Sequence, residues 1–215
     1  MRRRFDEELQ LLNKKLIEMG AQCEEVIRLA AAGLTEGRAE QVQKVKPMDA
    51  EIDRMERDIE SLCLKLLLQQ QPVARDLRQI SAALKMITDL ERIADQAADI
   101  SEISLQFGED EFIKEPEHIR MMATLAIGMV KDGVDSYINR DIETAKSLDS
   151  RDDRVDELFE TVKSDLIALI KKDPANADQA ILFMMIAKYL ERIGDHAVNI
   201  GEWAEYAATG QHKPG

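Results

Sequence analysis

The sequence predicts an all-α fold of six long helices, arranged as two tandem, pseudo-symmetric three-helix bundles. Three observations support this prediction. The composition is 45% apolar but only 4% aromatic, a balance that suits helices and disfavours β-sandwiches. Helix-breaking residues are sparse, so long uninterrupted stretches lie between them. The same acidic signature recurs in both halves of the chain, as LERIAD at 90–95 and LERIGD at 190–195.

The individual helices follow from the breaks, taken in chain order. Candidate breaks stand at Gly37, Pro47, Pro72, residues 107–116, residues 139–141 and the Asp173-Pro174 pair. The stretches predicted to be helical are 3–35, 39–70, 73–106, 115–137, 141–171 and 174–207. Because long helices joined by short turns lie antiparallel to their neighbours, these six are expected to form bundles.

An internal repeat relates the two halves. A shift of 100 residues lays 46–100 on 146–200 without a gap and gives 14 identities in 55 positions, where chance would give roughly four or five. Duplication predicts one three-helix unit at 1–106, a linker at 107–116 and a second unit at 117–215. The acidic linker, which contains proline, is expected to be exposed. The alternative is one six-helix bundle whose halves are similar by accident.

Charge and cysteine content exclude several classes of function. A net charge of −13 and a pI near 4.8 disfavour nucleic acid as a partner and favour cations or basic protein surfaces. No apolar stretch reads as a signal peptide or a membrane span, so a soluble, cytoplasmic protein is expected. Cys23 and Cys63 lack metal-site spacing and are predicted to be buried thiols.

The repeated signature places carboxylates one turn apart on one helix face. Glu91, Asp95 and Asp99 stack in the first half, and Glu191 and Asp195 in the second, with Asn199 in the third place. An apolar stripe through Leu77, Ile80 and Leu84 continues onto Glu91 and Asp95, which predicts that these acids are partly buried against a neighbouring helix. Like charges so placed repel each other and need compensation.

A second acidic pair opens the preceding helix of each repeat. The pairs are Asp49 with Asp53, and Asp149 with Asp153. If the two helices are antiparallel, each pair meets the carboxylates of the signature, giving about four carboxylates per half. Oxygen ligands in that number favour Mg²⁺, Mn²⁺, Ca²⁺ or ferric iron over tetrahedral zinc. The competing interpretations are a hydrated acidic face and internal ion pairs from Arg92 and Arg192.

Catalytic interpretations find less support. A ferritin-like di-iron site needs Glu-x-x-His pairs, and His118, His196 and His212 do not supply them. Neither a nucleophile–base arrangement nor a glycine-rich phosphate loop is evident. No basic pocket suited to phosphate is visible either, so direct phosphate sensing is not expected.

These motifs resemble the PhoU family of phosphate-signalling accessory proteins. The most specific are QPVARDLRQI at 71–80, LERIAD at 90–95 and IAKYLERIGDHAVNI at 186–200, and the resemblance covers nearly the whole chain. The E-x-x-x-D elements are similar to that family's metal-binding motif. Metal-ligand roles are thereby implied for Glu91, Asp95, Glu191 and Asp195, and by extension for Asp49, Asp53, Asp99, Asp149 and Asp153. Asn199 departs from the pattern because an amide brings no charge, so the two sites are expected to differ.

The resemblance also implies a function, which is that of a non-enzymatic negative regulator of phosphate uptake and phosphate-starvation signalling. Such a protein acts as an adaptor between the ATPase subunit of a phosphate ABC transporter and a sensor histidine kinase. It is expected to be a homodimer, cytoplasmic and peripheral to the inner face of the membrane through its partners. The implied cofactors are divalent or trivalent metal ions: Mg, Mn, Fe or Zn. A metal-dependent carboxylate-cluster enzyme and a cation-binding scaffold without a signalling role remain as alternatives.

Overall fold

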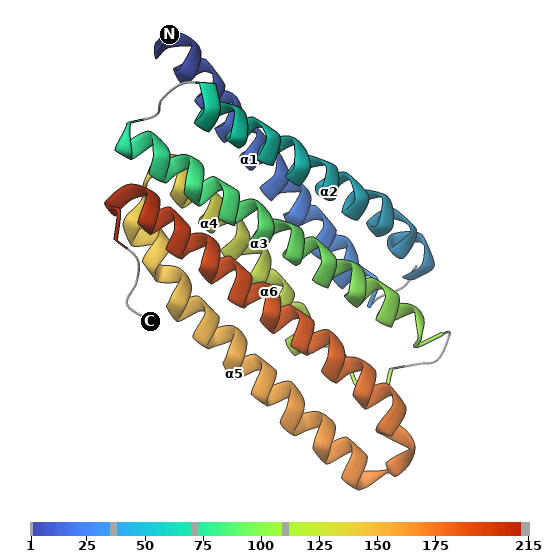
Figure 1. The fold of residues 1–215 in the computed structure, drawn as a ribbon. Helices are drawn as coiled ribbons and strands as arrows, with labels where there is room; N and C mark the ends of the chain where they lie inside the picture. The colour runs from blue at the N-terminus through green and yellow to red at the C-terminus, as the bar shows by residue number, and fades with distance from the viewer. Residues whose placement is uncertain (1, 35–37, 70–72, 109–111, 212–215) are drawn as a thin grey trace.

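The computed structural model describes residues 2–34, 38–69, 73–108 and 112–211, and its long elements are six helices (Figure 1). They agree closely with the predicted stretches. The helices are α1 (Arg2–Ala32), α2 (Arg38–Gln69), α3 (Ala74–Leu105), α4 (Glu117–Asn139), α5 (Ile142–Lys172) and α6 (Ala177–Thr209), with a short 3₁₀ turn η1 (Pro174–Asn176) before α6. The predicted all-α fold of two similar three-helix units is confirmed.

Local chemistry explains where the later helices begin and end. Arg140 adopts a left-handed conformation with φ of 57° and closes α4, and the Asp141 carboxylate then accepts the backbone N–H of Thr144 to cap α5. Gly210, with φ of 78°, closes α6 in the conformation that glycine adopts most readily. Pro47, a candidate break in the sequence, lies within α2 and does not end it.

The six helices form two layers. Helices α2, α3, α6 and α5 lie side by side in that order, and α1 and α4 cover one face of this layer (Figure 1). Helices α3 and α6 run antiparallel at its centre, so the two repeats meet along them. One continuous apolar core joins the repeats. Within it the Tyr137 hydroxyl of α4 donates to the Gln79 carbonyl of α3 over 2.9 Å.

Two expectations about exposure were wrong. The connection between α3 and α4 was expected to be exposed, yet Phe107 is buried and its ring contacts those of Phe112 and Phe183, with centroids about 5 Å apart. The strongly acidic residues 109–111 lie outside the described residues. Leu77, expected on the buried stripe, is 46% exposed. Cys23 and Cys63 are buried free thiols, as predicted.

Candidate functional site

In the first half, the predicted carboxylates come together between α2 and α3. Asp49 is half-buried, and its pKa is raised by burial and then by the charges of Asp53, Asp95 and Asp99. The pKa of Glu91 is likewise raised, first by burial and then by Asp95. Among the described residues, Asp49 Oδ1 is buried without a hydrogen-bond partner. The cluster therefore concentrates negative charge that its own neighbours do not fully offset.

Glu56 and Arg92 add two features to this first cluster. Glu56 is a partly buried member that the sequence reasoning missed, although it stands one turn after Asp53 on α2; burial and then Glu60 raise its pKa. Arg92 Nη1 donates to Asp95 Oδ2 over 3.0 Å, which confirms the expected internal ion pair. The two side chains are 54% and 37% exposed, and solvent screens the pair, so it offsets only part of the repulsion.

In the second half, a different pair of aspartates forms the cluster. Asp152 of α5 has a pKa raised to about 7, by burial first and then by Asp195, Asp156 and Glu191. Burial and then Glu191 raise the pKa of Asp195 and of Asp156. Lys188 forms an ion pair with Glu191, at 2.5 Å between Nζ and Oε2. Asp152 and Asp156 thus stand where Asp149 and Asp153 were expected.

The placement of Asp149 and Asp153 is a correction to the sequence alignment. Both residues are exposed on α5, as is Asp156, and of the two only Asp153 is among the charges that raise the pKa values of Asp152 and Asp156. The buried residues of α2 and α5 correspond at a shift of 103, not 100, whereas those of α3 and α6 keep the shift of 100. The corresponding buried pairs on α2 and α5 are Val45 with Leu148, Ile52 with Val155, and Ile59 with Val162. The connection after α5 is therefore three residues shorter, and Asp152 is the structural counterpart of Asp49.

Gly194 explains how Asp152 fits against α6. A Cβ atom at this position would lie 2.6 Å from Asp152 Oδ1 and 3.7 Å from Val155 Cγ1. The first distance is too short for a Cβ atom unless the Asp152 carboxylate moves, so the missing side chain of Gly194 leaves the space that this carboxylate occupies. Asp152 Oδ1 has no hydrogen-bond partner among the described residues. The one-letter difference between LERIAD and LERIGD is thus a structural difference between the clusters.

The contact between α3 and α6 contains polar residues that the sequence reasoning assigned differently. Asp89 Oδ1 lies 2.9 Å from His196 Nδ1 and accepts from Asn199 Nδ2 over 3.1 Å. Tyr189 forms a side-chain hydrogen bond with Asp99. Burial, and then the charge of Asp99, raises the pKa of the Tyr189 hydroxyl. At the shift of 100 that relates α3 to α6, Asp89 corresponds to Tyr189 and Asp99 corresponds to Asn199. Asn199 therefore binds across the repeats, and the departure from Asp at this position has a structural role.

The donor set suits a hard cation, but the side chains do not enclose one. Each cluster offers several carboxylates, raised pKa values and a buried oxygen without a partner, which fits the chemistry of an oxygen-bound metal ion. Among the residues that the structure describes, no three Asp, Glu, His or Cys side chains are grouped so as to hold one ion. Metal binding at these residues therefore stays a prediction.

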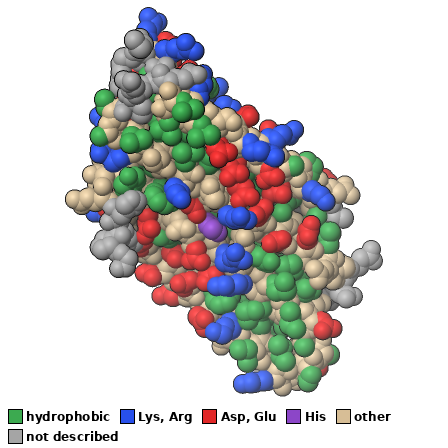
Figure 2. All heavy atoms as spheres, viewed as in Figure 1, with side chains coloured by type: hydrophobic (Ala, Val, Ile, Leu, Met, Phe, Trp, Pro, Cys, Tyr) green, Lys and Arg blue, Asp and Glu red, His purple; other side chains and the backbone are tan. Residues whose placement is uncertain are grey.

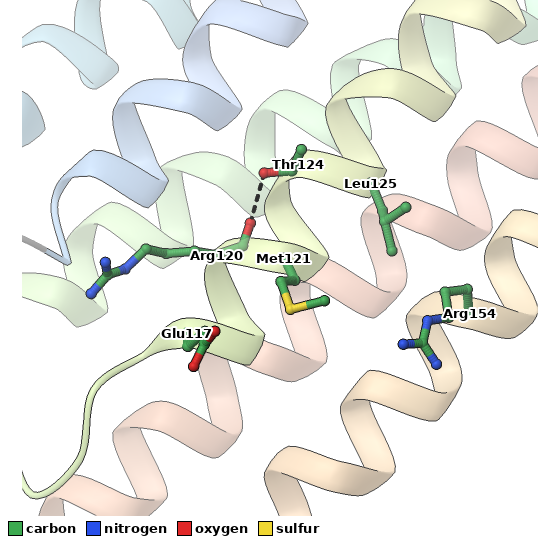
Figure 3. A pocket seen from close by; sticks show the side chains of 6 residues that line it. All are labelled: Glu117, Arg120, Met121, Thr124, Leu125 and Arg154. Carbon is green, nitrogen blue, oxygen red and sulfur yellow. Dashed lines mark hydrogen bonds between the residues drawn. The ribbon is translucent and has the colours of Figure 1, made fainter.

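A groove lies between α4 and α5 (Figure 3). Its volume is about 400 Å³, and Met121, Leu125, Arg120 and Arg154 line it together with Glu117 and Thr124. Both guanidinium groups bind acidic neighbours, Arg120 with Glu115 at 2.9 Å and Arg154 with Glu157 at 2.5 Å. Because these cations are already paired, the groove does not have the free positive charge that phosphate recognition needs.

Fold and site together define a class of protein: an all-helical tandem repeat with a carboxylate cluster between the second and third helix of each unit. Over the described residues, none of the helices is both long and apolar enough to cross a bilayer. The PhoU domain matches the chain twice, at residues 16–104 and 119–204. The chain therefore belongs to the PhoU family.

Individual relatives agree with this membership along almost the full chain. Proteins described as phosphate-specific transport system accessory protein PhoU homologs are 32% identical in Clostridium acetobutylicum, over 98% of this chain and 96% of that protein, and 30% identical in Deinococcus radiodurans, over 99% and 100%. The crystal structure of PhoU from Pseudomonas aeruginosa has a TM-score of 0.91 at 31% identity, covering 96% of this chain and all of that chain. The regulatory protein PhoU from Streptococcus pneumoniae gives 0.88 at 26% identity, covering 98% and 99%.

Proposed function

We propose that this protein is a regulatory accessory protein of a phosphate-specific transport system and a negative regulator of phosphate uptake and phosphate-starvation signalling. The observation that carries the proposal is the repeated PhoU domain, together with relatives described as accessory proteins of that system and matched along nearly their whole length. The family is not a known enzyme family, and the clusters are rich in acids without a paired nucleophile and base in the described residues.

We further propose its partners and its place in the cell. It acts as an adaptor between the ATPase subunit of the phosphate ABC transporter and the sensor histidine kinase, as a homodimer at the inner face of the membrane. A strongly acidic surface supports binding to basic protein surfaces more than to nucleic acid.

Deletion of the gene followed by complementation tests the regulatory role. In high phosphate, the deletion strain is expected to express phosphate-starvation genes, and the wild-type chain to silence them again. Affinity purification from membranes at low and high phosphate then checks for the ATPase subunit and the kinase. Unchanged gene expression in the deletion strain would contradict the proposal.

The metal-binding part of the proposal concerns the two carboxylate clusters. Asp49, Asp53, Glu91, Asp95 and Asp99 would hold ions in the first half, and Asp152, Asp156, Glu191 and Asp195 in the second, after side-chain rotations that bring their oxygens around one ion. The metal content of protein purified without chelator or metal-affinity tag is the measurement. Replacing Glu91 and Asp95 by Ala is expected to remove the ions of the first half only.

Asp149 provides the matched control for the second half. Asp149→Ala changes an exposed aspartate of the same helix and is expected to leave the metal content unchanged, whereas Asp152→Ala lowers it. Full metal content in a variant that lacks both Glu191 and Asp195 would reject metal binding by the second cluster without touching the regulatory role.

A further inference from the structure

The end of the first repeat where α2 leads into α3 differs in charge from the rest of the molecule. Acidic residues make up 42 of the 215 positions in the chain. Across residues 61–69 and 73–88, however, the one acid is Asp76, and it is buried. The same two stretches carry four basic residues, which are Lys65, Arg75, Arg78 and Lys85. This end therefore has an excess of positive charge, in a chain whose net charge is −13.

Exposed apolar side chains stand among these cations. Leu64 and Leu68 lie one turn apart on α2, and Val73 and Leu77 lie one turn apart at the start of α3. Leu68 and Val73 are 84% and 56% exposed, the highest values for large apolar side chains among the described residues. Figure 2 shows a hydrophobic area toward this end, with acidic areas nearer the middle of the same face. Exposed apolar side chains beside cations are typical of a surface that binds an anionic, partly apolar partner.

The corresponding end of the second repeat lacks this combination. The corresponding stretches, at the shifts of 103 for α5 and 100 for α6, are 164–172 and 173–188. They contain three acidic and three basic residues, so no charge is in excess. Lys171 takes the place of Leu68, and Asp173 that of Val73. Ile181 is exposed at this end, but it stands in a neutral stretch. The basic and apolar combination is thus a property of the first repeat alone.

The neighbouring helix ends do not reverse the excess of positive charge. The start of α1 lies beside α2, since Lys65 Nζ is 2.7 Å from Glu8 Oε1, and residues 2–10 contain three arginines and three acids. In the last turns of α6, Glu205 pairs with Lys146 of α5. The cations around the α2–α3 connection therefore keep their effect on a partner that approaches this end.

A membrane surface that contains anionic lipids matches both properties of this end. A bilayer interface accepts protruding apolar side chains such as Leu68 and Val73 without a matching pocket. The basic side chains around them attract anionic headgroups. The same headgroups repel the acidic surface of the rest of the molecule, which restricts the contact to this end.

We infer that the α2–α3 end of the first repeat binds an anionic membrane surface directly, through exposed apolar side chains that stand among basic ones. This contact goes beyond the proposed function, because it requires neither the transporter nor the kinase. The two repeats then differ in their relation to the membrane, since only the first can contact the lipid in this way.

Flotation of the full chain with lipid vesicles tests this contact. Vesicles of phosphatidylglycerol and of phosphatidylcholine are compared in the presence of chelator, which prevents metal ions from bridging the acidic clusters to the lipid. We expect binding to phosphatidylglycerol and at least tenfold weaker binding to phosphatidylcholine. High salt should abolish the binding, because screening weakens the attraction between the cations and the headgroups.

Three variants locate the contact on the molecule. Leu68→Glu, Val73→Glu and Arg75→Glu should each weaken binding to phosphatidylglycerol about tenfold or more, because each adds a charge that the lipid repels. All three change exposed side chains, and circular dichroism checks that each variant folds. Ile181→Glu is the matched control, because it adds the same charge to a side chain that is 55% exposed, close to the 56% of Val73. This control should bind like the wild type.

Several outcomes would contradict the lipid contact. They are a wild-type chain that does not float with phosphatidylglycerol vesicles, and equal binding by Val73→Glu and Ile181→Glu. Binding to soluble polyglutamate but not to the vesicles would instead assign this end to an acidic protein segment. In each of these cases the proposed function stands, since deletion of the gene tests it separately. Vesicle binding as expected, with unchanged gene expression in the deletion strain, would reject the proposed function and keep the lipid contact.

Discussion

Both repeats bring carboxylates together between their second and third helices, but the two clusters are packed differently. In the first half, Asp49 lies near Asp95 and Asp99 of α3, whose charges raise its pKa, and Ala94 of the signature is buried. In the second, Asp152 occupies the space left by Gly194, and its pKa is raised to about 7. Both halves keep the Leu, Ile and Ala positions of the signature buried in the core. Duplication therefore preserved the apolar packing of the signature helices α3 and α6 and the acids beside them. What changed is how closely the aspartate of the preceding helix packs against the signature helix.

The contact between α3 and α6 shows the same divergence. Asp89 binds both His196 and Asn199, whereas the related contact on the other side of the axis pairs Tyr189 with Asp99. An acid paired with an imidazole and an amide on one side thus corresponds to a phenol paired with an acid on the other. The two ends of this contact are therefore expected to respond differently to mutation.

The largest predicted difference between the repeats concerns Gly201 and its counterpart Ser101. A Cβ at Gly201 would lie 2.8 Å from Leu148 Cδ1 and 3.0 Å from the Ala145 carbonyl oxygen, and backbone cannot yield as a flexible side chain can. Gly201→Ser should therefore lower the free energy of unfolding by about 2–3 kcal/mol. The reverse change, Ser101→Gly, should cost less than about 1 kcal/mol through helix propensity. Urea unfolding measures both, and equal losses would contradict the asymmetry.

The next effect should come from the two ends of the α3–α6 contact. Asp89→Ala leaves His196 Nδ1 and Asn199 Nδ2 without their shared acceptor in a partly buried position, and should cost about 1–2 kcal/mol of unfolding free energy. Tyr189→Phe removes one hydroxyl that water can partly replace and should cost about 0.5 kcal/mol. Thermal and urea unfolding test the order. A larger loss for Tyr189→Phe would show that the two contacts have been ranked wrongly.

The sequence predicts the helices and the repeat well, because apolar periodicity and sparse breaks report on burial directly. It predicts the first cluster well too. The second cluster could not be assigned, because the run from Asp149 to Asp156 contains aspartates that match Asp49 and Asp53 at a shift of either 100 or 103. Only the burial of Val155 and Val162 decides between the two registers. The role of Asp89 was missed because its partners lie more than 100 residues away.

A smaller effect should separate Asp152 from Asp149 by its pH dependence. The folded-state pKa of Asp152, about 7, lies above the ordinary aspartate value. The unfolded chain therefore loses this proton first, so the contribution of Asp152 to stability is lost as pH rises from about 4 through 7. Asp152→Asn should change stability little at pH 4 and raise it at pH 8. Asp149→Asn should shift neither value. Unfolding curves in chelator check this, and parallel pH profiles for wild type and Asp152→Asn would contradict it.

The smallest change in stability, with a clear change in titration, should follow from Gly194→Ala, which turns LERIGD into LERIAD. Alanine favours the helix by about 0.5–1 kcal/mol, but its Cβ would stand 2.6 Å from Asp152 Oδ1 and must displace that carboxylate toward water. These effects oppose each other, so the melting temperature should change little. The Asp152 pKa should fall from about 7 toward its ordinary range, because the displaced carboxylate is better hydrated. Carbon-13 NMR titration of the aspartate carboxyl groups measures this pKa.

In an Asp152→Asn background, Gly194→Ala should have no further effect on pH dependence, since the group that it displaces is gone. An unchanged Asp152 titration in Gly194→Ala would mean that the difference between the clusters does not come from this glycine.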